Sequence, residues 1–227
     1  MPDSRTIADL VDVRPIVVVP VGSWEQHGPH LPFDTDTVIA TEIARRAIER
    51  LHEVPTMLTS SIGFAASGEH SGFAGTISIG TETTARILVE LVRSCDWSSG
   101  VVFVNGHGGN HEAIVEASTV IRTEGRRALV WSPAAADPTD SHAGRVETSV
   151  MLAVDPTRVR MDLADVGTTA PITDIITELR DRGVRAVSEN GVLGDPTRAS
   201  PDEGLVILDD WTSSLVQAVR TWLRDAT

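Results

Sequence analysis

An unbroken apolar run stands near the start of the chain: Ile16-Val17-Val18-Val19-Pro20-Val21-Gly22. The run is short and rich in β-branched residues, which is typical of a strand that is buried on both faces. Strands of this kind occur in parallel sheets whose two faces are covered by helices. This stretch therefore favours an α/β fold.

Helix-like and strand-like segments alternate after this run. The spacing of apolar residues predicts helices over 37–51, from 81 or 82 onward, around 114–121, and from 203 or 208 to 223. Short apolar runs predict further strands over 56–62, 101–104 and 128–131. The alternation predicts a mostly parallel sheet covered on both faces, and a length of 227 residues favours a single domain over 1–227.

The charge balance excludes several classes of function. The formal net charge is −13, and all 19 basic residues are Arg. A polyanion such as DNA would be repelled, so a nucleic-acid partner is disfavoured. The lack of Lys excludes Schiff-base chemistry and any phosphate-binding loop that needs a Lys.

The sequence carries no signal for secretion or membrane insertion. Its first residues lack the charged and then apolar pattern of a signal peptide, and no apolar stretch approaches about 18 residues. The single cysteine, Cys95, allows no intrachain disulfide, and without a paired His it is not expected to act as a nucleophile. We expect a cytoplasmic protein with no membrane partner.

The first chemical motif follows the opening apolar run, and reads Gly22-Ser-Trp-Glu25-Gln-His27-Gly-Pro-His30-Leu-Pro-Phe-Asp34-Thr-Asp36. Glu25 and His27 are two residues apart, so in an extended chain their side chains leave on the same face. Asp36 lies at the start of the next predicted helix and is close enough in sequence to fold back toward them. Asp34 is better explained as a residue that caps that helix.

A second motif, Asn105-Gly-His107-Gly-Gly-Asn110, directly follows the predicted strand over 101–104. Binding sites of parallel α/β sheets lie beyond the carboxyl ends of the strands, so we expect His107 to lie near Glu25 and His27. The motif has neither the GxGxxG spacing nor the Lys of a nucleotide-binding loop. Asn110 is expected to cap the helix that follows.

The third motif is Ser141-His142-Ala-Gly-Arg-Val-Glu147-Thr148-Ser149. Glu147 offers a further carboxylate ligand, and His142, if unligated, is suited to act as a general acid or base near neutral pH. Histidine and carboxylate side chains bind divalent metals and can hold two at once. The three motifs together predict a metal-dependent hydrolase.

These motifs resemble the creatininase family of metal-dependent amidohydrolases. The similarity extends from the first predicted strand to the segment Gly191-Val-Leu-Gly-Asp195-Pro196. The resemblance implies a three-layer α/β/α fold with a mostly parallel sheet, assembled into a homo-oligomer that is often a hexamer. It also implies that Glu25 and His107 hold one metal ion and His27 the other, with Asp36 bridging them.

The sequence departs from creatininase itself at Gly109, where that enzyme has a Glu two residues after the motif His. Similarity to family members with the His-Gly-Gly form implies that Glu147 supplies the missing ligand. The resemblance implies two divalent ions per subunit, and a His/carboxylate site suits Zn, Fe(II) or Mn.

Further side chains are candidates for contact with the substrate or with the ligands. Glu69 and His70 belong to a loop that lies near the substrate in the family, and Trp24 and His30 flank the first motif. The resemblance implies that His142 donates a proton to the leaving nitrogen, after a water of lowered pKa has attacked the amide.

The resemblance implies hydrolysis of an amide bond. The short chain and the segments 141–149 and 191–196 are most similar to a subgroup of peptidases that cut a modified ribosomal peptide near its C-terminus. Alternatives are a small cyclic amide such as creatinine, which Gly109 disfavours, or the formamide of an opened purine-type ring. From another class, the chain could be a non-catalytic metal-binding subunit.

Overall fold

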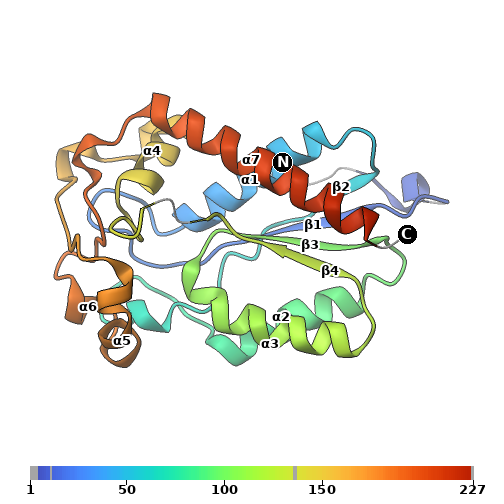
Figure 1. Ribbon diagram of the computed structural model, residues 1–227, viewed down its shortest axis with the longest axis horizontal. Coiled ribbons are helices and arrows are strands. Elements are labelled where there is room, and N and C mark those ends of the chain that lie inside the picture. The colour runs from blue at the N-terminus through green and yellow to red at the C-terminus, as the bar shows by residue number, and fades with distance from the viewer. Residues whose placement is uncertain (1–4, 11, 135–136, 226–227) are drawn as a thin grey trace.

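The computed structural model describes residues 5–10, 12–134 and 137–225 (Figure 1). Its sheet has four parallel strands in the order β2-β1-β3-β4. The strands are β1 (Ile16–Val21), β2 (Thr56–Leu58), β3 (Gly100–Asn105) and β4 (Ala128–Trp131). Every residue of β1 and β3 is buried, so these two runs form the centre of the sheet, as their composition predicts.

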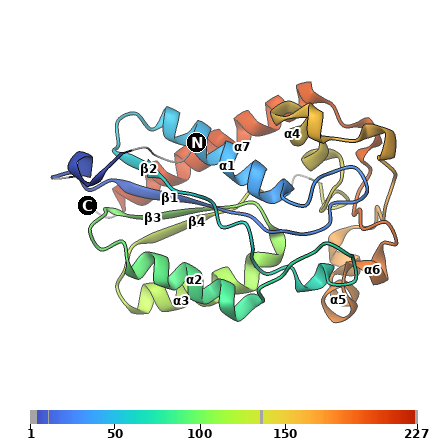
Figure 2. The same ribbon diagram turned by 180° about the vertical axis from the view of Figure 1, so that it is seen from behind.

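Helices cover both faces of the sheet, as Figures 1 and 2 show from opposite sides. One face carries α1 (Thr35–Arg50) and α7 (Pro201–Arg224), with α4 (Arg145–Val154) packed against α7. The other face carries α2 (Thr81–Arg93) and α3 (His111–Thr123). The predicted three-layer α/β/α fold with a parallel sheet is confirmed.

The pleat of the strands divides the core between the two faces. Ile16 and Val18 of β1 pack toward α1 and α7, whereas Val17 and Val19 pack toward α2 and α3. Successive side chains of a strand point to opposite faces, so a continuous apolar run is needed when both faces are covered. This requirement explains why β1 shows no alternation with polar residues.

Two short helices, α5 (Ile172–Arg182) and α6 (Val184–Val187), lie away from these layers (Figure 1). They pack against the 3₁₀ turn Gly68–His70, which belongs to the loop after β2. The other 3₁₀ turns are Ile7–Leu10, Gly108–Asn110, Pro156–Arg158, Met161–Leu163 and Pro196–Arg198. Of these turns, Gly68–His70 and Gly108–Asn110 come after the carboxyl ends of β2 and β3, whereas Ile7–Leu10 precedes the amino end of β1.

Several sequence-based predictions need correction. The predicted strand over 56–62 ends at Leu58, because Ser60 and Ser61 are exposed and only Ile62 makes a further bridge to β1. Helix α7 begins at Pro201, earlier than predicted, because the Ser200 side chain caps it by accepting a hydrogen bond from the backbone of Glu203. No helix was predicted at α4 or α5; α4 buries polar residues, and α5 fully buries none.

Asn110 does not cap α3, contrary to the prediction from its position. Its side chain accepts a hydrogen bond from the backbone of Ala66 and donates to the Gly22 carbonyl and to Asn105 Oδ1. This buried amide therefore ties the ends of β1 and β3 to the loop after β2.

The structure also bears on membrane insertion. Within the described residues, none of the helices combines the length and the apolar character needed to cross a bilayer.

Candidate functional site

Polar side chains gather beyond the carboxyl ends of β1 and β3. Glu25 and His27 come from the loop after β1, which folds back because Glu25 N donates a hydrogen bond to the Phe33 carbonyl. His107 directly precedes the turn that follows β3. The relative exposure is 0% for Glu25, 1% for His27 and 4% for His107. The two central strands thus bring these groups into one buried site.

Asp36 reaches the same site from the first turn of α1, where the helix N-terminus stabilises a carboxylate. Helix α1 lies so close to the end of β3 that a Cβ at Gly106 would be 2.5 Å from the Asp36 carbonyl oxygen. Asp36 Oδ1 lies 3.0 Å from Nε2 of His27, and Asp36 Oδ2 lies 3.3 Å from Nδ1 of His107. The two oxygens of one carboxylate therefore face two different histidines.

The third motif contributes from α4 and the segment before it. Backbone hydrogen bonds in both directions with Leu193 hold His142 in place. Glu147 Oε2 accepts a hydrogen bond from Ala143 N at 2.7 Å and lies 3.9 Å from Nε2 of His27. The rings of His27 and His142 are 4.4 Å apart between centroids. All three motifs meet at one site.

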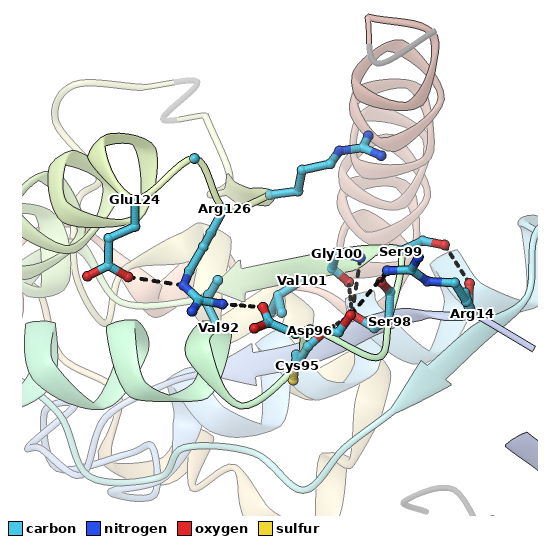
Figure 3. A pocket seen from close by; sticks show the side chains of 12 residues that line it. Arg14, Val92, Cys95, Asp96, Ser98, Ser99, Gly100, Val101, Glu124 and Arg126 are labelled. Carbon is cyan, nitrogen blue, oxygen red and sulfur yellow. Dashed lines mark hydrogen bonds and ion pairs between the residues drawn. The ribbon is translucent and has the colours of Figure 1, made fainter.

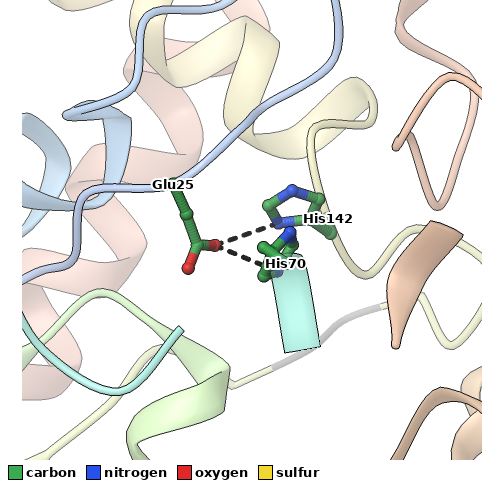
Figure 4. A group of neighbouring side chains, drawn as sticks. All are labelled: Glu25, His70 and His142. Carbon is green, nitrogen blue, oxygen red and sulfur yellow. Dashed lines mark ion pairs between the residues drawn. The ribbon is translucent and has the colours of Figure 1, made fainter. Parts of the chain in front are cut away.

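The Glu25 carboxylate connects this site to two further histidine rings (Figure 4). Its Oε1 lies 3.3 Å from Nε2 of His70 and 3.7 Å from Nδ1 of His142. Its Oε2 accepts a hydrogen bond from Ser67 Oγ at 2.7 Å and lies 3.0 Å from Nε2 of His107. Glu25 is thus central to the cluster.

Backbone carbonyls orient three of the histidine rings. A carbonyl oxygen only accepts, so the ring nitrogen beside it must carry a hydrogen, and in a neutral ring the other nitrogen is then bare. Metal-binding histidines show this same pattern of a ring N–H donated to a carbonyl. The pairs are His27 Nδ1 with Glu25 O at 3.1 Å, His107 Nε2 with Ala66 O at 2.9 Å and His142 Nε2 with Gln26 O at 2.9 Å.

The neighbouring carboxylates attract positive charge to two of these rings. Burial lowers the pKa of His27, but the hydrogen-bonded Asp36 and the charge of Glu147 outweigh it and raise that pKa to about 10. Burial also opposes protonation of His107, yet Glu25 and Asp36 raise its pKa well above the usual value. Positions that attract a proton so strongly also attract a divalent cation.

In the third motif, burial dominates the pKa values of Glu147 and His142 and disfavours the charged form of each side chain. Burial raises the pKa of Glu147 to about 7, against the effect of the His27 charge. Burial, followed by the charges of His27 and His70, lowers the pKa of His142 well below the usual value. The His142 ring is therefore neutral at pH 7 and can accept a proton.

The donor atoms of the site fit divalent metal ions. Two buried carboxylate oxygens, Glu25 Oε1 and Asp36 Oδ2, have no hydrogen-bond partner among the described residues. Buried charges in proteins are paired or coordinate metals, and imidazole with carboxylate suits Zn, Mn or Fe(II). Ligand atoms within 4.8 Å of one another occur in the groups Glu25-His27-Asp36, His27-His142-Glu147, Glu25-Glu69-His107 and Glu25-His70-His142.

Glu69 lies where a side chain at residue 109 would otherwise stand. A Cβ on Gly109 would come within 1.9 Å of Glu69 Oε1 and 2.9 Å of the Ala66 carbonyl oxygen. Glu69 Oε1 is also 3.4 Å from Nε2 of His107. The sequence predicted only that Glu69 contacts the substrate or the metal ligands. Its position in the structure makes it a candidate ligand alongside Glu147.

Trp24 and His30 make contacts of their own beside the cluster. Trp24 packs on Phe33 and Phe64, with ring centroids 6.1 and 5.7 Å apart. His30 Nε2 lies 2.9 Å from Thr148 Oγ1, and burial lowers the pKa of His30 to about 4. Neither belongs to the groups of potential ligands, so a role in substrate binding stays a prediction for both.

The sequence analysis overlooked two polar residues of the site. The amide nitrogen of Gln26 lies 2.9 Å from Nδ1 of His70 and 3.0 Å from the Gly191 carbonyl, and Ser67 bonds to Glu25. The signal was present, because Gln26 stands inside the Glu-Gln-His run and Ser67 begins the run that carries His70.

The fold and the site together define an α/β enzyme with a buried histidine–carboxylate centre. The chain belongs to the creatininase family, since the family described as creatinine amidohydrolase matches residues 3–219. It is therefore a hydrolase of the amidohydrolase and peptidase class.

Known proteins refine this assignment. The chain is 46% identical to the mycofactocin precursor peptide peptidase of Mycobacterium tuberculosis (strain CDC 1551 / Oshkosh), over 97% of this chain and 90% of that protein. A solved variant of creatininase superposes with a TM-score of 0.80 at 23% identity, covering 96% of each chain. A creatininase structure described as "Creatininase Mn" gives a TM-score of 0.78 at 22% identity, again over 96% of each chain. These two structures show the shared fold.

Proposed function

We propose that this chain is a metal-dependent peptidase that cleaves a modified ribosomal precursor peptide near its C-terminus in mycofactocin biosynthesis. The observation that carries the chemistry is the placement of His27 and His107 against opposite oxygens of Asp36. The choice of substrate follows from the relative in Mycobacterium tuberculosis, which matches 97% of the chain.

We assign two divalent ions, Zn, Mn or Fe(II), to this centre. Glu25 and His107 would hold one ion, His27 and Glu147 the other, and Asp36 would serve as a ligand to both. When bound, such ions lower the pKa of water and polarise the scissile carbonyl. Burial of Glu25, His27, Asp36 and His107 keeps bulk water away and strengthens the electrostatic interactions among them, whereas Glu147 is partly exposed.

His142 handles the proton of the reaction. Its Nε2–H donates to the Gln26 carbonyl, so the bare Nδ1 faces the cluster at 3.7 Å from Glu25 Oε1. The lowered pKa makes the ring neutral at the start. Nδ1 therefore takes a proton from the attacking water and delivers it to the leaving nitrogen, acting first as base and then as acid.

The test of this function is release of the C-terminal fragment from the modified precursor peptide, followed by mass spectrometry. The reaction is run with and without a chelator, and creatinine is assayed in parallel. We expect the peptide to be cleaved only without chelator, and creatinine not to be hydrolysed. Cleavage of creatinine alone would refute the substrate, and full activity under excess chelator would refute the metal dependence.

Replacing His142→Ala separates proton transfer from metal binding. We expect kcat to fall about 10²- to 10⁴-fold, the usual contribution of a positioned acid–base group, while the metal content per chain stays that of the wild type. Cys95→Ser, a change far from the site, should alter neither quantity. A His142→Ala protein that loses metal would make His142 a ligand, as the group His27-His142-Glu147 allows.

A further inference from the structure

Gln26 stands between two proposed ligands, Glu25 and His27, and its side chain is buried at 5% exposure. Its amide nitrogen lies 2.9 Å from Nδ1 of His70, 3.0 Å from the Gly191 carbonyl and 3.1 Å from Nε2 of His142. An amide nitrogen has only two hydrogens for these three neighbours. The choice between them determines where the histidine rings carry their hydrogens.

The orientation of the Gln26 amide is fixed by its surroundings. Gly28 N donates to Gln26 Oε1 at 2.8 Å, and the Gly191 carbonyl needs a donor on the other side. A flipped amide would place oxygen against oxygen at Gly191 and N–H against N–H at Gly28. The nitrogen of the amide therefore faces Gly191 and the two rings.

His142 does not receive a hydrogen from this amide. Its Nε2 lies 2.9 Å from the Gln26 carbonyl oxygen, which only accepts, so Nε2 already carries a hydrogen. The 3.1 Å approach to the Gln26 amide nitrogen is thus a contact between two donors. The two amide hydrogens go to the Gly191 carbonyl and to Nδ1 of His70.

The assignment of the two amide hydrogens of Gln26 determines the tautomer of His70. Because Nδ1 accepts from Gln26, the neutral ring carries its hydrogen on Nε2, which lies 3.3 Å from Glu25 Oε1. This contact is electrostatic, because Glu25 Oε1 makes no hydrogen bond among the described residues, and Nδ1 of His142 at 3.7 Å is bare. The hydrogen-bearing nitrogen of His70 therefore faces Glu25.

We infer that Gln26 is a positioning residue that fixes the tautomer of His70, so that His70 turns its Nε2–H, and not a lone pair, toward the Glu25 carboxylate. The link to turnover rests on the proposed hydrolytic function; the tautomer does not. The arrangement also disfavours a metal ion in the group Glu25-His70-His142, because His70 presents a hydrogen to it and not a lone pair.

The tautomer can be measured without substrate. Protein labelled with ¹⁵N-histidine and loaded with diamagnetic zinc gives ¹⁵N–¹H spectra that distinguish Nδ1–H from Nε2–H, and the chain has 7 histidines. His70→Gln assigns the His70 signals, and His111→Gln, at an exposed position, is the matched control. We expect His70 to carry its hydrogen on Nε2 in the wild type; a hydrogen on Nδ1 alone would overturn the inference.

Gln26→Glu reverses the donor at this position and keeps its shape. The carboxylate still accepts from Gly28 N, but toward His70 it offers only an acceptor, so we expect Nδ1 of His70 to gain a hydrogen. With zinc content unchanged, kcat should fall about 10- to 100-fold while KM stays nearly constant, as for partners that orient metal ligands. A His70 spectrum identical to that of the wild type would refute the inference.

A second pair of variants covers a Gln26→Glu protein that fails to fold. His70→Gln places an amide donor near the position of Nε2 and can still reach Glu25, whereas His70→Asn is too short and reaches only Gln26. We expect His70→Gln to retain at least about tenfold more of the wild-type kcat than His70→Asn. Equal losses would count against the inference. The expected spectrum in a wild-type protein that leaves the precursor peptide intact would uphold the positioning role and reject the substrate.

Discussion

The two ends of the sheet carry charged residues in opposite settings. At the carboxyl end, Glu25, His27 and Asp36 are buried, and two of their oxygens lack a hydrogen-bond partner within the part of the chain that the structure describes. At the amino end, a hollow of about 600 Å³ is lined by Arg14, Asp96, Glu124, Arg126 and other residues (Figure 3). There the charges are exposed and already paired: Arg126 Nε bonds to Glu124 Oε2 at 3.0 Å, and Arg126 also pairs with Asp96.

This contrast shows what identifies a reactive site in this protein. The hollow at the amino end offers space, but its ion pairs satisfy one another in contact with water, where such pairs contribute little. At the carboxyl end the charges are removed from water and incompletely matched, and a bound cation would complete them. Unmet charge under burial is the better guide to the chemistry than volume.

Among the variants considered, Asp36→Asn is expected to have the largest effect on the buried site at the carboxyl end of the sheet. The change keeps the shape but removes the negative charge shared by His27 and His107. We expect the metal content to fall and kcat/KM to drop about 10³-fold or more, because several kcal/mol of stabilisation by the metal are lost. Metal analysis and the peptide assay measure both. Wild-type metal content with full activity would refute the bridging role.

The pH dependence of metal binding tests whether the buried site has the unusual charge state that distinguishes it from the hollow at the amino end. The pKa values of His27 and His107 are raised, so at pH 7 each ring carries a proton that a metal ion must displace. Zinc affinity should therefore weaken as pH falls, by about tenfold per pH unit for each proton displaced. Titration calorimetry in buffers of different ionisation enthalpy counts the protons. A binding heat that is independent of the buffer would contradict this picture.

The substitution Gly109→Ala tests how the buried site depends on the side chains that lie against Gly109. The new Cβ would lie 1.9 Å from Glu69 Oε1, 2.3 Å from Nε2 of His107 and 2.9 Å from the Ala66 carbonyl, so Glu69 and the His107 ring must move. We expect a loss of about 10- to 100-fold in kcat or metal affinity, as for changes around metal ligands. Gly108→Ala is the matched control, because nothing lies within 4 Å of its Cβ position. Equal behaviour of the two variants would show that the present positions of Glu69 and His107 are not required.

The smallest effect is expected at the amino end. Arg126→Ala removes the exposed pairs with Asp96 and Glu124, which water and salt already screen. Tm should shift by at most about 4 °C, and peptide cleavage should be unchanged. Thermal unfolding and the peptide assay check this. A marked loss of activity would show that the hollow at the amino end takes part in the function, contrary to the comparison made above.

The fold was accessible from the sequence because its central strands are continuous apolar runs. Such runs in β1 and β3 indicate burial on both faces, and the glycines and polar motifs after them mark the end of the sheet that carries the site. The helices α4 and α5 were not predicted. In α5 the signal was present, because Ile172, Ile175, Ile176 and Leu179 stand at helical spacing, whereas α4 turns the polar Thr148 and Ser149 inward.

The site was accessible only in part. Histidine and carboxylate residues at strand ends are visible in the sequence, and the structure brings Glu25, His27, Asp36 and His107 together; their metal roles remain predictions. The approach of Glu69 to the empty space at Gly109 depends on two loops that are distant in sequence. The roles of Gln26 depend on which neighbours receive its two amide hydrogens, and those neighbours come from distant parts of the chain.

The carbonyl groups that orient His27, His107 and His142 have a consequence for how this protein can change over time. A substitution changes the side chain of a residue but leaves its main-chain carbonyl oxygen in place. The carbonyl groups can therefore orient these rings even when the side chains of the surrounding loops change. The reaction centre is thereby insulated from variation in the residues that meet the substrate. A family built this way can exchange one amide substrate for another without rebuilding its catalytic core.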